Sequence, residues 1–293
     1  MDNVWEFVEF SLLGLLSGGV LALIGLSFVL VYKGTRAVNF AVGEIMMFGA
    51  YMYYAAHVTL KLPPLFAFAV ALGLVTLLSI LIERAVLRPL AGQPVISVLM
   101  ATIGLASVLH GFVEAVWGGD TLEVPPLVPR MPLRFAEVVI PGAALGNFAI
   151  AAALITGFLL FFHYSRTGIA LRATASDPVT ASTMGINVRY AQRLTWILAG
   201  AVGTMAGVLI GASGGLSPLL ASTALSVFAV IILGGMDSVL GVIVASLLIG
   251  WLESVVVGYV GGKVRDVLPY LVVLAILVVK PYGLFGSRDI ERL

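Results

Sequence analysis

The sequence of 293 residues contains no cysteine and few charged residues. Without cysteine the chain cannot form a disulfide, a thiolate metal site or a cysteine nucleophile. Only 11% of the residues are charged, against about 25% in soluble domains, so polar side chains cannot cover a surface that faces water. The net charge of +1 offers no electrostatic footprint for nucleic acid. These shortages exclude a soluble domain and a nucleic-acid-binding protein.

Apolar residues dominate instead. Hydrophobic residues make up 60% of the chain and the mean hydropathy is +1.11. The apolar runs are residues 7–32, 38–58, 65–87, 94–117, 148–164, 194–213, 223–235, 238–257 and 267–285. The run 223–235 is short, and short glycine-interrupted segments mark transport pathways. We therefore predict an all-α fold, a polytopic transmembrane helical bundle of about 8–9 spans with at least one short or broken helix, which forms a single domain over residues 1–293.

Two polar stretches separate these runs. Residues 118–147 are rich in proline and are expected to form an ordered or extended loop, and residues 165–193 form the second stretch. Membrane proteins carry an excess of Lys and Arg in their cytoplasmic loops. Alternating the spans from an outside N-terminus places 11 of the 16 basic residues inside. This prediction puts 118–147 outside, and it puts 165–193 and the C-terminus inside.

The stretch 165–193 contains signals for a short helix. Ser176 or Asp177 can cap its N-terminus and Pro178 suits its first turn. Gly185 can close it in a left-handed conformation. A helix of about seven residues is too short to be stable alone in water. The stretch is therefore either an ordinary surface turn or a coupling element that docks into a cytoplasmic partner.

Five stretches together form a recognisable pattern. They are Asn39–Glu44 (N-F-A-V-G-E), Ile82–Leu90 (I-E-R-A-V-L-R-P-L), Ser165–Asn187, Leu233–Ser238 (L-G-G-M-D-S) and Lys280–Gly286 (K-P-Y-G-L-F-G). In this order they resemble motifs in the membrane permease subunit, of the H type, of high-affinity ABC importers for branched-chain amino acids. Val42 and Asp237 depart from the His and Gly of that pattern.

The resemblance implies a bacterial inner-membrane importer with several partners. It implies a second homologous permease subunit, two cytoplasmic ATPase subunits and a periplasmic substrate-binding protein. The residues that would contact the ATPase are Arg172, Ser176, Asp177, Pro178, Met184, Gly185 and Asn187. The chain has no P-loop of its own, since Val264 follows Gly262 and Lys263. ATP and magnesium would therefore be bound by the partner subunits, and this chain would be a transport subunit without a cofactor.

Several residues are candidates for the transport pathway or a gate. They are Asn39, Glu44, Gly234, Gly235 and Asp237. Glu44 lies in an apolar run, where a carboxylate costs about 2.5–3.5 kcal/mol and normally faces the bundle interior or water. The structural alternatives are a packing hydrogen bond for Glu44 and helix capping close to the cytoplasmic face for Asn39.

Two other classes of function stay open at this point. An ion-coupled secondary transporter or channel would use Glu44, Glu114 or Glu253, and His110 with Glu114 lies at helical i,i+4 spacing. An intramembrane protease could use the G-x-S-G run at 211–214, although no histidine follows residue 163. Three isolated histidines give no metal site. Branched-chain amino acids are the solute that the resemblance implies, but the residues themselves do not identify it.

Overall fold

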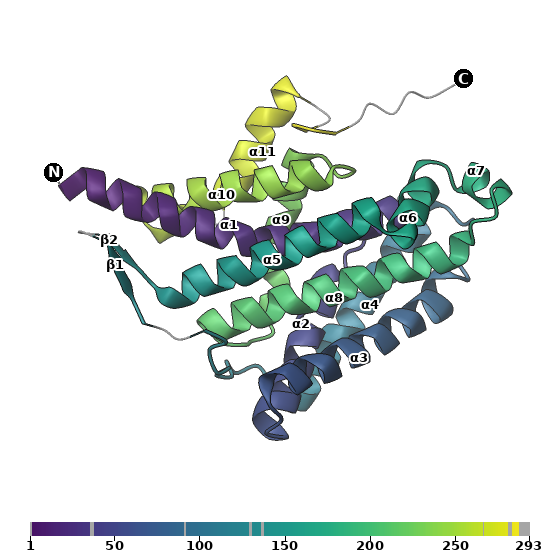
Figure 1. The fold of residues 1–293 in the computed structure, drawn as a ribbon, viewed down its shortest axis with the longest axis horizontal. Coiled ribbons are helices and arrows are strands. Elements are labelled where there is room, and N and C mark those ends of the chain that lie inside the picture. The colour runs from purple at the N-terminus through teal and green to yellow at the C-terminus, as the bar shows by residue number, and fades with distance from the viewer. Residues whose placement is uncertain are drawn as a thin grey trace.

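The computed structural model describes residues 2–35, 38–90, 92–128, 131–135, 138–265, 267–280 and 283–286. Most of them are helical (Figure 1). The α-helices are α1 (Asp2–Thr35), α2 (Val42–Tyr54), α3 (Pro64–Ile82), α4 (Val95–Trp117), α5 (Gly142–Tyr164), α6 (Arg166–Ser176), α7 (Pro178–Thr183), α8 (Val188–Gly214), α9 (Leu220–Gly234), α10 (Val239–Val260) and α11 (Leu268–Val279). Two π-helical turns, η1 (Ala55–Thr59) and η2 (Glu83–Leu87), extend α2 and α3, and a 3-10 turn, η3 (Gly262–Val264), follows α10.

The predicted all-α polytopic bundle is confirmed, but the count of about 8–9 spans is not. In the described part of the chain six helices are long and apolar enough to cross a membrane: α1, α3, α4, α5, α8 and α10. The other three apolar runs form α2, α9 and α11, of 13, 15 and 12 residues. At 1.5 Å per residue α9 and α11 are about 18–23 Å long, shorter than the hydrocarbon core of about 30 Å, whereas η1 extends α2 to Thr59.

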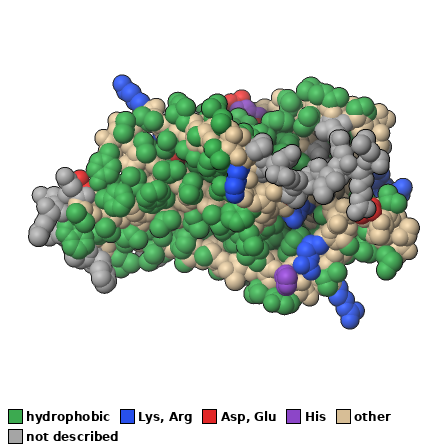
Figure 2. Space-filling view, turned by 90° about the horizontal axis from the view of Figure 1, so that it is seen from above, with side chains coloured by type: hydrophobic (Ala, Val, Ile, Leu, Met, Phe, Trp, Pro, Cys, Tyr) green, Lys and Arg blue, Asp and Glu red, His purple; other side chains and the backbone are tan. Residues whose placement is uncertain are grey.

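Figure 2 shows a surface that is mostly hydrophobic over its length. Most of the basic side chains in this view lie toward the end of the molecule at which Figure 1 places α6 and α7. A bundle that lies in lipid is expected to have this distribution, because charged groups are stable only where they reach water.

The two polar stretches differ from each other. Residues 118–141 contain no helix in their described part; β1 (Leu133–Phe135) pairs with β2 (Val138–Ile140) in an antiparallel arrangement. By contrast, the expected loop 165–193 is largely helical, because it contains α6, α7 and the first turn of α8. Local side-chain caps produce these helices, as described below.

Glycines bring the central helices into close contact. α1 packs lengthwise on α10, where a Cβ atom added to Gly14 would lie 2.6 Å from the carbonyl oxygen of Gly250. α2 packs on the middle of α8, where a Cβ atom added to Gly207 would lie 2.7 Å from the carbonyl oxygen of Met46. Small residues at such crossings let backbones approach closely, as is usual in lipid. As a result, α2 begins beside the middle of α8, away from its ends.

Candidate coupling and transport sites

The short helix α7 begins at a strong side-chain cap. The Asp177 carboxylate accepts hydrogen bonds from the backbone N–H groups of Val179 (2.9 Å) and Thr180 (3.2 Å), and from the Thr180 hydroxyl. These bonds lower the pKa of Asp177, and the bond from the Thr180 hydroxyl has the largest effect. Pro178 occupies the first turn, where its missing N–H leaves no donor unpaired. The predicted capped helix is confirmed, with Asp177 as its cap and Ser176 as the last residue of α6.

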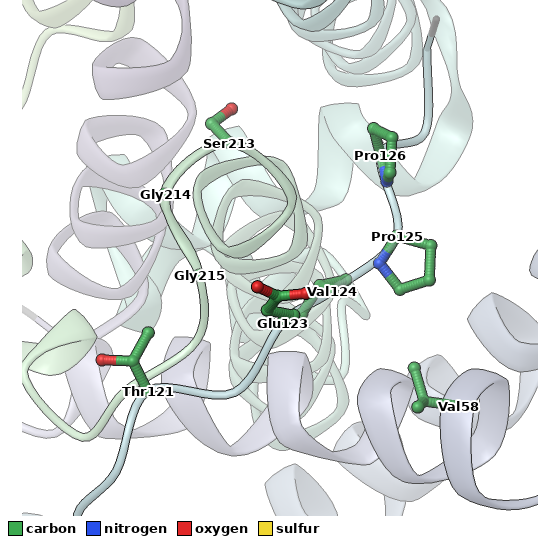
Figure 3. A pocket seen from close by; sticks show the side chains of 9 residues that line it. All are labelled: Val58, Thr121, Glu123, Val124, Pro125, Pro126, Ser213, Gly214 and Gly215. Atoms are coloured by element: carbon green, nitrogen blue, oxygen red, sulfur yellow. The ribbon is translucent and has the colours of Figure 1, made fainter. Parts of the chain in front are cut away.

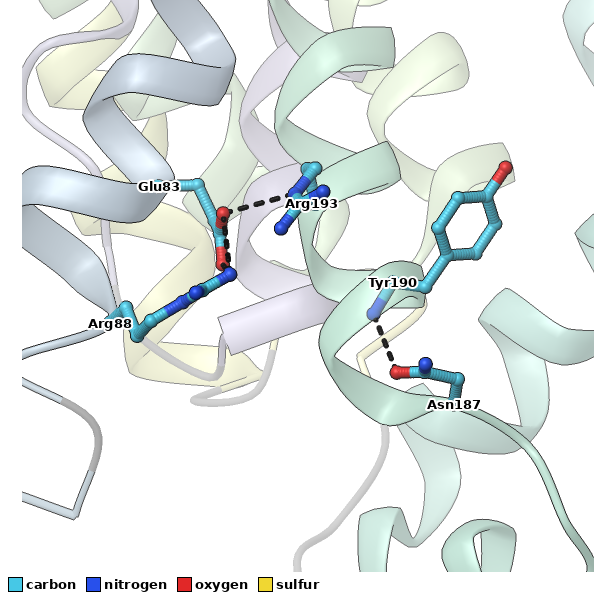
Figure 4. A network of polar contacts seen from close by, with 5 residues as sticks. All are labelled: Glu83, Arg88, Asn187, Tyr190 and Arg193. Carbon is cyan, nitrogen blue, oxygen red and sulfur yellow. Dashed lines mark hydrogen bonds and ion pairs between the residues drawn. The ribbon is translucent and has the colours of Figure 1, made fainter.

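The far end of α7 is closed by its own backbone. Gly185 adopts φ +83°, so the Ile186 N–H donates to the carbonyl of Ala181 and the Gly185 N–H to that of Ser182, each at 3.1 Å. This is the Schellman arrangement that a left-handed glycine permits. Asn187 then caps α8, because its Oδ1 accepts a hydrogen bond from the Tyr190 N–H at 3.0 Å (Figure 4).

α7 presents apolar side chains to its surroundings. Val179 is 73% exposed and Met184, at its C-cap, is 79% exposed. Of the residues within α7, Ala181 alone is buried. A six-residue helix with exposed apolar side chains is stabilised mainly by its two caps, and its outer face is available for another protein.

A cavity of about 230 Å³ joins the predicted coupling residues to a predicted pathway residue. Arg172 and Ser176 of α6 line it together with Lys33 and Asp237, and Tyr32 and Ala175 complete it. The Arg172 Nη2 atom also donates to the His163 carbonyl oxygen at 3.0 Å. The sequence had assigned Arg172 and Asp237 to different roles, but the fold places both at the same end of the bundle.

Gly234 and Gly235 form the turn between α9 and α10. A Cβ atom added to Gly234 would lie 2.6 Å from the carbonyl carbon of Gly241, and Gly235 has φ +98°. Ser238 caps α10 by accepting the Gly241 N–H at 3.0 Å. Segment 283–286 lies on this turn, where the Leu284 N–H donates to the Leu233 carbonyl oxygen at 2.7 Å. Pro281 and Tyr282 of the same motif lie outside the described residues.

An ion-pair network that the sequence did not predict as a site lies near the start of α8. The buried Glu83 carboxylate binds the Arg193 Nε atom at 3.0 Å and the Arg88 Nη2 atom at 3.3 Å (Figure 4). It thereby ties the end of α3 to α8. The available signal was Glu83 beside two arginines at the end of an apolar run, but its second partner, Arg193, is 110 residues away.

Glu44 and Asn39 occupy different environments. Glu44 lines a cavity of about 440 Å³ that also contains His110 and Glu114 of α4. The His110 Nε2 and Glu114 Oε1 atoms are 3.5 Å apart. Asn39 is only 2% exposed, and its Oδ1 accepts the Ala41 N–H at 2.9 Å. Asn39 lines a small cavity together with Trp196 of α8, and its bond to Ala41 lies just before the start of α2.

A cavity of about 600 Å³ is lined by residues at the C-terminal end of α8, opposite to the end that α7 precedes. The segment Thr121–Pro126 forms one wall and the turn Ser213–Gly215 forms another (Figure 3). Ser213, in the G-x-S-G run, accepts a hydrogen bond from the Asn147 Nδ2 atom (2.6 Å) and donates to the Leu209 carbonyl oxygen (2.9 Å). No described histidine is among its hydrogen-bond partners, so this serine has no general base of the kind that a nucleophile requires.

These features define a multi-pass membrane protein with a helical element outside the bundle at one end and ionisable side chains between its helices. Residues 11–277 match the family described as branched-chain amino acid transport system / permease component. The chain belongs to this family. No group of three or more His, Asp or Glu residues in the described part of the chain could hold a metal ion.

Individual relatives match over nearly the whole chain. The high-affinity branched-chain amino acid transport system permease protein BraD of Pseudomonas aeruginosa is 28% identical, over 100% of both chains. The permease protein LivH of Escherichia coli is 28% identical over 95% of each chain, and a probable LivH of Methanocaldococcus jannaschii is 27% identical over 94% of this chain and 91% of its own. The solved structure of PsaBC from Streptococcus pneumoniae in complex with Fab shares the fold, with a TM-score of 0.50 and 15% identity over 93% of this chain and 90% of its own.

Proposed function

We propose that the chain is the membrane-spanning permease subunit of an ABC importer that moves branched-chain amino acids into the cytoplasm. The observation that carries this proposal is α7, a helix capped at both ends with exposed apolar side chains, in a chain whose family match runs from residue 11 to 277. The relatives named above are permease proteins of branched-chain amino acid transport systems. The nucleotide chemistry, with ATP and magnesium, belongs to partner subunits in this proposal.

The proposed orientation places α7 in the cytoplasm. The N-terminus and the 118–147 loop then face the periplasm, and the C-terminus faces the cytoplasm, in a bacterial inner membrane. Clustering of Arg88, Arg172 and Arg193 near the α7 end supports this orientation, because basic residues favour the cytoplasmic side. A periplasmic binding protein would deliver the solute to the outer cavity of about 600 Å³.

In the proposed mechanism, two cytoplasmic ATPases drive the movement. One of them contacts α7, whose backbone continues through Gly185 and Asn187 into α8. α8 packs against α1, α2 and α3, and the Glu83–Arg193 pair ties it to α3. A push on α7 is therefore transmitted to several spans as a rigid-body shift. Asn39, Glu44, Gly234, Gly235 and Asp237 would lie along the pathway or its gate, which this chain would share with a second permease subunit.

Reconstitution tests the proposal. The chain would be purified with the products of its neighbouring reading frames and placed in vesicles with labelled leucine, isoleucine or valine. We expect uptake that requires both ATP and the binding protein. Uptake that proceeds without ATP and follows a proton or sodium gradient would instead establish an ion-coupled carrier, in which Glu44, Glu114 and Glu253 are the candidate coupling groups.

Site-specific cross-linking tests the coupling role of α7 directly. Because the chain has no cysteine, V179C or M184C gives a single reactive thiol on the exposed face of α7. We expect each to cross-link to the ATPase. The matched control is M131C, which is 77% exposed in the 118–147 loop and should not cross-link to it. Equal labelling of all three variants by a membrane-impermeant reagent from outside would contradict the orientation.

A further inference from the structure

The cavity between α2 and α4 combines ionisable and apolar walls inside the membrane-spanning part of the chain. On α4, Ile103, Ser107, His110 and Glu114 follow one another at helical spacing, so they form one stripe. Glu44 from the first turn of α2 completes the ionisable side of the cavity. The ionisable side chains of Glu44, His110 and Glu114 are costly at membrane depth. The packing of α2 against α4 therefore does not by itself account for them.

The charges in this cavity select for a cation. Two carboxylates and one imidazole line it, and among the residues that the structure describes no Lys or Arg does. In the described chain Glu44, His110 and Glu114 do not form a group of three that could hold a metal ion. Two carboxylates suit instead a hydrogen-bonding cation such as an alkylammonium group, which donates in several directions.

The remaining walls suit a branched aliphatic group. Phe40, Ile103 and Leu225 line the same cavity, and its volume of about 440 Å³ lies within the range of about 300–1,000 Å³ that is usual for small-molecule sites. An ammonium at the Glu44 and Glu114 carboxylates would leave an isobutyl or similar side chain against these apolar residues.

We propose that this cavity is an intramembrane subsite that binds the α-ammonium of the transported amino acid through Glu44 and Glu114. This inference rests on the proposed function and adds to it a recognition site within the spans. Glu44 and Glu114 come from different helices, and α2 packs along α8 through Gly49 and Gly207. Movement of α8 therefore changes the separation of the two carboxylates, and with it the affinity for the ammonium. Such a difference in affinity is what couples a ligand to a conformational change.

The test uses the reconstituted complex with E44Q, E114Q and the double variant. Loss of a hydrogen bond to a charged group is expected to lower the maximal rate of leucine uptake by about tenfold to a hundredfold. The leucine concentration for half-maximal uptake should stay unchanged, because the binding protein sets it. E6Q is the matched control, since it removes the same charge from the exposed start of α1, outside the lining of the cavity, and should transport like the unmodified protein.

Two probes test the chemistry of recognition in the unmodified complex. Isoamylamine is leucine without its carboxylate, and 4-methylpentanoate is leucine without its ammonium. With the binding protein already loaded with leucine, we expect the amine to inhibit uptake and the acid to have no effect. Equal inhibition by both, or inhibition by the acid alone, would overturn the proposal even if a variant failed to assemble.

The outcomes separate this inference from the proposed function. If the unmodified complex shows no ATP-driven leucine uptake, the proposed function fails. If it transports leucine while the assembled double variant keeps the full rate, the inference alone fails. The E44D and E114D variants retain the charge and should restore part of the uptake; assembled Asp variants as inactive as the Gln variants would show that the charge is not what matters.

Discussion

Two short helices of this protein, α7 and α2, are stabilised in opposite ways. α7 has six residues, is capped by Asp177 and Gly185, and is almost entirely exposed. α2 has 13 residues and no side-chain cap, and nine of them are buried. Local hydrogen bonds thus define the first helix, and tertiary packing on α8 defines the second.

The difference matches what each helix would do in transport. An element that docks on a partner must keep its shape while most of its surface is free, and side-chain caps provide this without a core. A helix that changes the shape of a cavity inside the bundle must move together with its neighbours. The tight contact between α2 and α8 makes α2 move with α8. α8 connects the two, because it begins at Val188, close in the chain to α7, and contacts α2 along its middle.

The largest effect is expected from G49A in α2. A Cβ atom at this position would lie 2.7 Å from the Thr204 Cβ atom of α8, and overpacking of this kind costs about 1–3 kcal/mol. We expect a lower thermal unfolding temperature in detergent and reduced uptake. The control is G73A in α3, where the added Cβ meets nothing within 4 Å. Equal melting of both variants would show that the α2–α8 contact does not define α2.

A smaller loss is expected from E83Q at the end of α3. The variant weakens the bonds to Arg88 and Arg193, and bonds to charged groups contribute about 1.5–3 kcal/mol each when buried. The two arginines are partly exposed, so we expect the lower end of this range for the whole network. A double-mutant cycle with R193Q measures the coupling. R84Q, at the exposed neighbouring residue, is the control; a coupling near zero would remove this link between α3 and α8.

The contrast between local hydrogen bonds in α7 and tertiary packing in α2 also explains how much of the structure could be predicted from the sequence. The caps of α7 depend on residues two or three positions apart, so Asp177, Pro178 and Gly185 could be interpreted from sequence alone. The Glu44 cavity and the Glu83–Arg193 pair depend on helix packing, which brings together residues far apart in the chain. Asn39 combines the two, because its bond to the Ala41 N–H is local whereas its burial in a cavity shared with Trp196 depends on packing. The count of about 8–9 spans is not confirmed for a related reason, since apolar runs do not reveal which helices are too short to cross alone.

At α7 itself, D177A should act locally. Loss of the N-cap is expected to raise backbone hydrogen exchange in residues 178–184 by roughly fivefold, with no change in the global unfolding temperature. D177N keeps an oxygen that can accept the same N–H bonds, so its exchange should stay near that of the unmodified chain. If D177A lowered the unfolding temperature as much as G49A, α7 would belong to the core of the bundle and the contrast with α2 would disappear.

The smallest effect concerns pH. The Thr180 hydroxyl and the Val179 and Thr180 N–H groups favour the Asp177 carboxylate and lower its pKa. A carboxyl with a lowered pKa stabilises the folded form above its unfolded pKa of about 3.9, and that contribution is lost as pH falls through the lowered value. Hydrogen exchange of α7, corrected for the intrinsic rate, should therefore be constant between about pH 8 and 5 and rise only in stronger acid. In D177N, which has no proton to gain at this position, the corrected rate should not rise; a rise equal to that of the unmodified chain would show that another group controls α7.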